Sequence, residues 1–104
     1  MFYRLYTGDD NQSHMEEYSP PDILPAVSAV FRRHEPGNFI DWHFAPRKQF
    51  IVTLEGQVEI GTGDGTVYTL GPGDMMLAED LTGQGHTTRG VGAIPRVSIA
   101  IPLD

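Results

Sequence analysis

The stretch that decides the fold is residues 39–70, FIDWHFAPRKQFIVTLEGQVEIGTGDGTVYTL. It contains short runs rich in Val, Ile, Thr and aromatic residues, separated by glycine-containing segments at 55–56 and 61–65 that favour turns. Asp64-Gly65 between two alternating runs is typical of a β-hairpin. A phosphate-binding loop would end in Gly-Lys-Ser/Thr and open a helix, whereas this glycine cluster has no lysine and runs into a strand. The stretch therefore predicts consecutive antiparallel strands.

The same pattern continues on both sides of this stretch. Strand-like runs occur at 39–44, 49–54, 57–60, 66–70, 75–78, 86–89 and 96–101, with a short strand at 1–6 and a strand-like segment at 26–33. The 12 Gly and 8 Pro among 104 residues argue against long helices. We expect an all-β sandwich or barrel of two antiparallel sheets. Residues 1–36 would form an N-terminal strand and an irregular segment of the same domain as a barrel over 37–104.

Composition excludes several kinds of function. With no cysteine, the chain has no disulfides and no thiol nucleophiles, so metal ligands must be His, carboxylate or amide groups. The 14 acidic residues outnumber the 7 basic ones, which opposes nucleic-acid binding. No apolar run approaches the roughly 20 residues of a membrane span, and residues 1–6 do not resemble a signal peptide. We expect a cytoplasmic protein without a membrane partner, too short for a separate nucleotide-cofactor domain.

Strand alternation predicts which side chains share a face. An extended segment at 39–44 would place Asp41 and His43 on one face. In the run at 49–54, Gln49, Ile51 and Thr53 would share a face. The opposite face of that run carries Phe50, Val52 and Leu54, and a strand that is apolar on both faces in so small a protein suggests that its outer face meets another sheet or a second subunit. We therefore expect a homodimer.

The spacing of Gly37, His43, Gln49 and Gly56 resembles the first cupin motif, G-x5-H-x-H-x3-E-x6-G. Ala45 stands where that motif has its second His, and Gln49 stands where it has Glu. Residues 73–86 resemble the second motif, G-x5-P-x-G-x2-H, with an approach to the final His that is two residues longer.

Several further segments, in order, resemble a subgroup of small single-domain cupins that carry D-W-H-x-A-P-R-[RK]-Q. They are DWHFAPRKQ at 41–49, GDG at 63–65, GPGD at 71–74, AED at 78–80 and GQGH at 83–86. The resemblance covers about residues 37–103. It implies a double-stranded β-helix, a jelly-roll-like barrel that is often dimeric and has its pocket inside. It does not imply one reaction, because cupins include enzymes of many kinds and non-catalytic binders.

The resemblance also implies a metal centre of three His and one Glu. His43 matches the first His, His86 matches the third, and Gln49 takes the Glu position, while Ala45 cannot ligate. Asp41 would supply a carboxylate, giving a two-His–one-carboxylate set for a divalent ion such as Fe, Mn, Zn or Ni. In the alternative interpretation His43, Gln49 and His86 are hydrogen-bonded polar residues of a pocket that has lost its metal.

Two further side chains are candidates for catalysis and substrate binding. Glu79, in an apolar barrel, would act as a general acid or base with His43 or His86, or else cap a loop at the barrel mouth. Arg47, near the mouth, would hold a substrate carboxylate, or else form a structural ion pair. Two other histidines, His14 and His34, are interpreted as surface residues.

We therefore expect a small cupin enzyme that acts on a small organic molecule in the barrel. The catalytic residues would be Glu79, His86 and His43, with Arg47, Asp41 and Gln49 binding the substrate. Isomerisation or cyclisation, lyase chemistry and oxygenation stay open. The alternative is a non-catalytic binding or sensor protein, favoured by the replacement of two of the four usual metal ligands.

Overall fold

The computed structural model describes residues 1–23 and 25–103. Leu24 and Asp104, which fall in the predicted 1–36 and 37–104 parts, lie outside the described residues. The strands are β1 (Phe2–Thr7), β2 (Ser13–Glu17), β3 (Val30–His34), β4 (Phe39–His43), β5 (Gln49–Glu55), β6 (Gln57–Gly61), β7 (Val67–Leu70), β8 (Met75–Glu79), β9 (His86–Val91) and β10 (Arg96–Pro102). No helix among the described residues is long and apolar enough to cross a membrane.

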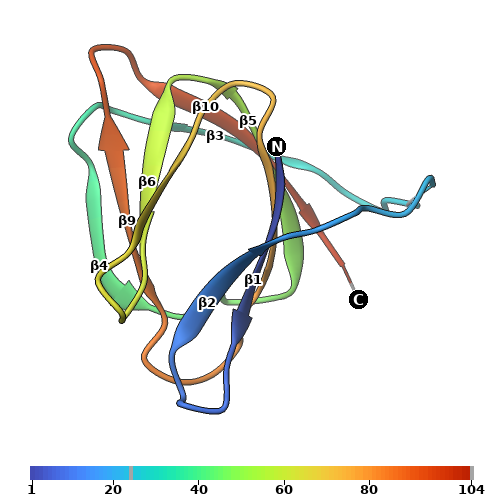
Figure 1. Ribbon diagram of the computed structural model, residues 1–104. Coiled ribbons are helices and arrows are strands. Elements are labelled where there is room, and N and C mark those ends of the chain that lie inside the picture. The colour runs from blue at the N-terminus through green and yellow to red at the C-terminus, as the bar shows by residue number, and fades with distance from the viewer. Residues whose placement is uncertain (24, 104) are drawn as a thin grey trace.

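The strands form two sheets that face each other around a common interior (Figure 1). One sheet has the order β2-β1-β8-β5-β10-β3 and the other the order β4-β9-β6-β7. The predicted all-β fold of two sheets is confirmed. The six-stranded sheet is mixed rather than purely antiparallel, because β1 pairs parallel with β8.

The N-terminal third differs most from the prediction. A strand was not expected at β2, whose sequence SHMEE has no β-branched residue. It forms because the chain turns at 8–12, where Asn11 adopts a positive φ of 62°, and returns antiparallel along β1. β3 begins at Val30, four residues later than the predicted segment.

The apolar core lies in the interior of the barrel. Its buried members are Leu5, Ala45, Val58, Ile60, Leu70, Met76 and Ala78. They come from both sheets and interdigitate, as the two inner faces of packed sheets do. Four of them, Ala45, Ile60, Met76 and Ala78, also border a cavity in the interior.

The outer face of β5 is partly covered by the chain itself. Phe50 is only 3% exposed and packs edge-on against Phe2, with 5.5 Å between ring centroids. Phe50 is therefore not available to a second subunit, contrary to the expectation for that face. Leu54, on the same face, is 41% exposed. The homodimer stays a prediction.

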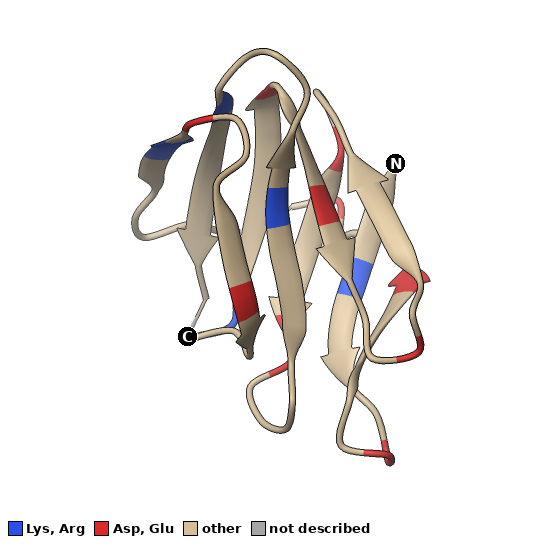
Figure 2. Cartoon of the chain, turned by 90° about the vertical axis from the view of Figure 1, so that its left-hand side faces the viewer, with Lys and Arg blue, Asp and Glu red and all other residues tan. Residues whose placement is uncertain are grey.

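The β6–β7 hairpin is built around Asp64. The hydroxyl of Thr62 donates to Asp64 Oδ1 at 2.7 Å, and the backbone N–H of Thr66 donates to the same oxygen at 2.9 Å. These bonds favour the carboxylate form and lower the pKa of Asp64 to about 2. Gly65 has a φ of +86°, which glycine adopts without strain. Figure 2 looks onto this sheet from outside and shows acidic positions at turns and along strands.

Replacing Asp64 by Ala should lower the Tm at pH 7. Because a carboxyl with a depressed pKa stabilises the fold only while ionised, we expect the full difference above about pH 4, shrinking as the pH falls through about 2. Circular dichroism melting curves from pH 7 towards pH 2 measure it, with Asp9→Ala as the control in another turn. A Tm difference that does not change with pH would contradict this account of the turn.

Candidate functional site

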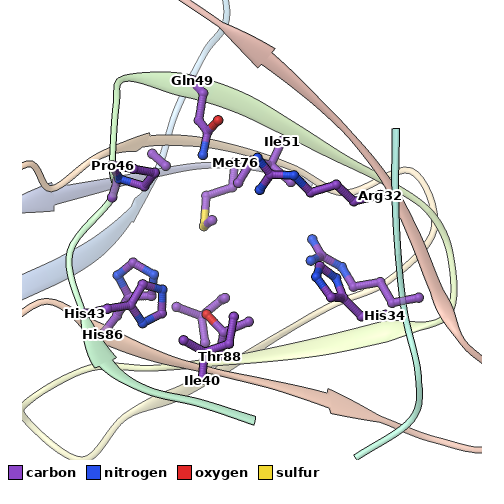
Figure 3. A pocket seen from close by; sticks show the side chains of 14 residues that line it. Arg32, His34, Ile40, His43, Pro46, Gln49, Ile51, Met76, His86 and Thr88 are labelled. Atoms are coloured by element: carbon purple, nitrogen blue, oxygen red, sulfur yellow. The ribbon is translucent and has the colours of Figure 1, made fainter. Parts of the chain in front are cut away.

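A cavity of about 240 Å³ lies between the two sheets. It is lined by Arg32, His34, Ile40, His43, Ala45, Pro46, Gln49, Ile51, Ile60, Met76, Ala78, His86, Thr88 and Arg96. Its volume is just below the roughly 300 Å³ at which ligand pockets usually begin, so it suits a small molecule. Figure 3 shows His43 and His86 together at one end, and Arg32 with His34 at the other.

The structure brings the rings of His43 and His86 into contact at a tilt. They are register partners in the antiparallel β4–β9 pair. Their ring centroids lie 4.4 Å apart with 56° between the ring planes. Two residues far apart in the sequence thus form one pair of imidazoles at the cavity wall.

Each imidazole is oriented through its Nδ1 atom. His43 Nδ1 lies 2.8 Å from the carbonyl oxygen of Asp41, and His86 Nδ1 lies 2.6 Å from Asp80 Oδ2. A carbonyl oxygen only accepts, so His43 Nδ1 carries the proton and donates; an ionised carboxylate imposes the same tautomer on His86. Both rings therefore keep Nε2, with its lone pair, as the nitrogen left for the cavity.

Asp80 is the functional candidate that the site-residue predictions missed. It is fully buried, and its Oδ2 accepts from the Ser13 hydroxyl as well as from His86. Its Oδ1 has no hydrogen-bond partner among the described residues. A buried carboxylate oxygen without a partner is rare and often marks a functional position. Strand alternation could have identified Asp80 in the sequence, because it follows the inward-facing Ala78 by two residues and therefore shares its face.

Gly85 holds the β8–β9 loop against the end of β4. It has a φ of +81°, and a Cβ there would overlap the carbonyl oxygen of His43. The loop therefore approaches the His43 backbone more closely than any other residue would allow. This approach fixes the distance between His43 and the start of β9, where His86 stands.

Asp41 does not face the cavity, so the predicted shared face with His43 is wrong. The β4–β9 register shifts between Ile40 and His43, and these two residues both line the cavity. Such a bulge adds a residue to one strand and reverses the alternation beyond it. Asp41 is exposed, and its Oδ1 accepts from the N–H of Trp42 at 2.9 Å.

Glu79 also lies outside the cavity lining, so its predicted placement in the apolar interior is wrong, and its acid–base role stays untested. Along β8, Met76 and Ala78 line the cavity, whereas Glu79 has the opposite parity. Its carboxylate forms an ion pair with Arg4 of β1 and lies 3.5 Å from Lys48 Nζ. Glu79 links neighbouring elements on the outer face.

Arg47 is exposed and is not among the residues that line the cavity, so its role in binding a substrate carboxylate stays a prediction. The adjacent Pro46 and the buried Gln49 do line it, which agrees with the predicted inward face of Gln49. Arginine enters the cavity instead from β3 and β10, as Arg32 and Arg96, neither of which the sequence analysis singled out.

His34 lines the cavity rather than the outer surface, contrary to its interpretation as a surface residue. Burial lowers its pKa, and the positive charges of Arg96 and Arg32 lower it further. Both guanidinium groups thus act on the same end of the cavity. Burial also lowers the pKa of Arg96 to about 10, which still leaves it protonated at neutral pH.

The donor set does not fit the four-ligand metal centre that the cupin resemblance implies. His43 and His86 offer two imidazole nitrogens, and Gln49 adds a neutral amide. Ala45 and the outward Asp41 leave the remaining ligand positions unfilled. Within residues 1–23 and 25–103, no three His, Asp or Glu side chains are grouped as metal ligands.

No known protein-family profile matches the sequence, and no curated protein is significantly similar to it. Solved structures are similar in fold. One is an uncharacterized conserved protein with a double-stranded β-helix domain from Klebsiella pneumoniae, at 26% identity and a TM-score of 0.53, over 81% of this chain and 82% of that one. Another is an RmlC-like cupin from Desulfovibrio desulfuricans, at 20% identity and a TM-score of 0.52, over 96% and 79% of the two chains. This chain has the cupin fold.

A third similar structure is a conserved protein of unknown function from Streptococcus pyogenes, at 17% identity and a TM-score of 0.54, over 79% of this chain and 69% of that chain. At these identities the structural neighbours establish the fold. The chemistry of this chain has to be argued from its own side chains.

Replacing Asp80 by Asn should release the tautomer of His86, because an amide also donates hydrogen bonds. We expect the ¹⁵N chemical shifts of the two His86 ring nitrogens to change in long-range ¹H–¹⁵N spectra. Losing the charged acceptor of two hydrogen bonds should also destabilise the fold by about 1.5–3 kcal/mol. Asp74→Asn, which removes an acidic side chain that does not line the cavity, is the matched control. Unchanged His86 shifts in the Asp80→Asn variant would contradict the assignment.

Proposed function

We propose that this cupin is an enzyme that transfers protons on a small organic molecule held in the barrel cavity. The proposal rests on one observation: two adjoining imidazoles, His43 and His86, have both Nδ1 atoms engaged and keep Nε2 for the cavity. Histidine is the side chain that most often acts as a general acid or base.

The two rings have different supports and therefore different roles. The buried carboxylate of Asp80 stabilises a positive charge on His86, whereas the Nδ1 of His43 donates to an uncharged backbone carbonyl. We assign His86 as the base, whose free Nε2 takes a proton from the substrate to give an imidazolium beside the Asp80 carboxylate. The same Nε2–H then returns the proton to a neighbouring substrate atom, while His43 Nε2 accepts a hydrogen bond that positions the substrate.

The remaining wall of the cavity can exclude water and orient a substrate. Ile40, Ile51 and Met76 provide apolar surface, while the Gln49 amide and the Thr88 hydroxyl provide hydrogen-bonding groups (Figure 3). Isomerisation or cyclisation and lyase reactions can proceed by proton transfer alone. They therefore suit this site better than metal-dependent oxygenation, for which the donor set lacks the third imidazole and the carboxylate of the usual centre.

A non-catalytic binding or sensor protein is the second candidate. Ala45 and Gln49, which replace two ligands of the usual cupin centre, favour it. A binder would keep the cavity and its polar groups, but it would leave its ligand chemically unchanged.

Hydrogen–deuterium exchange on small molecules separates these candidates. In D₂O, we expect the protein to exchange C–H for C–D in at least one member of a panel of short 2-oxo and hydroxy carboxylic acids, followed by ¹H NMR. His86→Gln and His43→Gln should each slow exchange by about 100-fold or more. His14→Gln, whose ring pairs with Asp10 away from the cavity, is the matched control.

Binding of a panel member without exchange would support the non-catalytic candidate instead. Exchange that persists in both cavity variants would show that the two imidazoles are not the proton-transferring groups.

Metal content tests the cofactor expectation. Because the cavity offers two imidazoles and one neutral amide, we expect protein purified without added metal to retain well below one equivalent of Fe, Mn, Zn or Ni. Mass spectrometry of the metals measures this. About one equivalent that is lost in both His43→Ala and His86→Ala, and kept in His14→Ala, would show a metal centre instead.

A further inference from the structure

We infer that the cavity selects a small organic carboxylate, whose anionic group is held by Arg32 and Arg96 at the end opposite the imidazole pair. This inference rests on the proposed function, since it names the substrate class of the same cavity.

The pairing of β3 with β10 creates this cationic end. Arg96 is the register partner of His34, and Arg32 is the partner of Ser98. Arg32, His34 and Arg96 all line the cavity, because antiparallel partners point to the same side of a sheet. In Figure 3, Arg32 and His34 lie across the cavity from His43 and His86, so one small molecule can contact both ends.

The positive charge of this end has no acidic counterpart in the cavity. The chain carries 14 acidic residues and a net charge of −7, yet none of the cavity-lining residues is Asp or Glu. Arg32 and Arg33 are both exposed, but only Arg32 lines the cavity, whereas Arg33 lies 3.7 Å from Glu35. The arginine outside the cavity has an acidic neighbour, and the cavity lining has no acidic residue.

Arg96 is under-satisfied for a buried charge. It is 7% exposed, and its Nη2 donates to the Thr53 hydroxyl at 3.1 Å. Its buried Nε has no hydrogen-bond partner among the described residues. A guanidinium taken from water and given only a neutral partner destabilises the folded protein. Such an arrangement is explained if a ligand completes it.

A carboxylate matches this end better than a neutral polar group. The planar guanidinium fork donates two parallel hydrogen bonds to a carboxylate, and hydrogen bonds between charged groups are the stronger ones. Between the two ends, Ile40, Ile51 and Met76 provide apolar contact for a short carbon body. Phosphate has similar charge chemistry but no such body, so the two can be told apart by binding.

The test compares charged and neutral probes of equal shape by isothermal titration calorimetry. Benzoate, pyruvate and lactate are the carboxylate probes, benzamide, pyruvamide and lactamide are their respective neutral counterparts, and inorganic phosphate is a separate arm. We expect at least one carboxylate to bind more tightly than its amide and than phosphate. Arg32→Gln and Arg96→Met should each weaken that binding about 10- to 100-fold. Arg33→Gln, one residue away on the outer face, should leave it unchanged.

Thermal stability supplies a second readout. If Arg96 is retained for a ligand, Arg96→Met should lose carboxylate binding while its Tm without ligand equals or exceeds that of the wild type. A lower Tm with carboxylate binding intact would assign Arg96 a structural role and overturn the inference. Failure of all three carboxylates to bind the wild type, or preferential binding of phosphate, would overturn it too.

The outcomes also separate this inference from the proposed function. His86→Gln should abolish proton exchange while the arginine end still binds the carboxylate probe. Arginine-dependent binding without exchange in the wild type would refute the enzyme and keep the carboxylate site. Proton exchange that is lost in His86→Gln but unchanged in Arg32→Gln and Arg96→Met would support the enzyme and refute the carboxylate site.

Discussion

The buried carboxylate of Asp80 connects the parts of the barrel on which the cavity depends. Its Oδ2 accepts hydrogen bonds from Ser13 on β2 and from His86 on β9, and its backbone carbonyl accepts from the N–H of Ala45 after β4. Elements of both sheets are thereby tied at one point, and the ring of His86 is turned towards His43. A charge this deeply buried destabilises the fold unless it is hydrogen-bonded, so the two bonds to Oδ2 are needed to keep Asp80 in place. The contacts of Asp80 therefore both hold the two sheets together at this end of the barrel and set the orientation of the imidazole pair.

The local alternation of the sequence predicted part of this arrangement well. Gln49 and Ile51 line the cavity, as the parity of their strand requires. The same rule failed at Asp41, because a bulge in β4 makes Ile40 and His43 both face inward. A bulge depends on how two strands pair, which one strand's sequence does not reveal. At Glu79 strand alternation is correct, since Glu79 follows the inward-facing Ala78 and points outward. The interior placement was expected only from its position in the cupin-like motif.

The cationic end of the cavity could not be predicted, for a different reason. Arg32 and Arg96 belong to strands at opposite ends of the chain, and they face the same space only because β3 pairs with β10 at the edge of the six-stranded sheet. Nothing in the run AVSAVFRRH or in RVSIAIP indicates that partner. Arg47 had a similar chemical character and lay within a motif, yet it is on the exposed side of its loop. Long-range pairing, rather than residue type, decides which arginine reaches the cavity.

The parallel pairing of β1 with β8 has a consequence for how the chain folds. The first strand lies between β2 and β8, so the inner strands of the six-stranded sheet cannot be completed until the eighth strand is present. Contacts between residues so distant in sequence form slowly, because a long loop must close first. Until then the edges of β1 and β5 that β8 will occupy are unpaired, and a nascent or truncated chain that lacks β8 exposes backbone edges suited to association with other chains. The same late step brings Asp80 to Ser13, so the cavity wall that contains His86 is among the last features of the molecule to form.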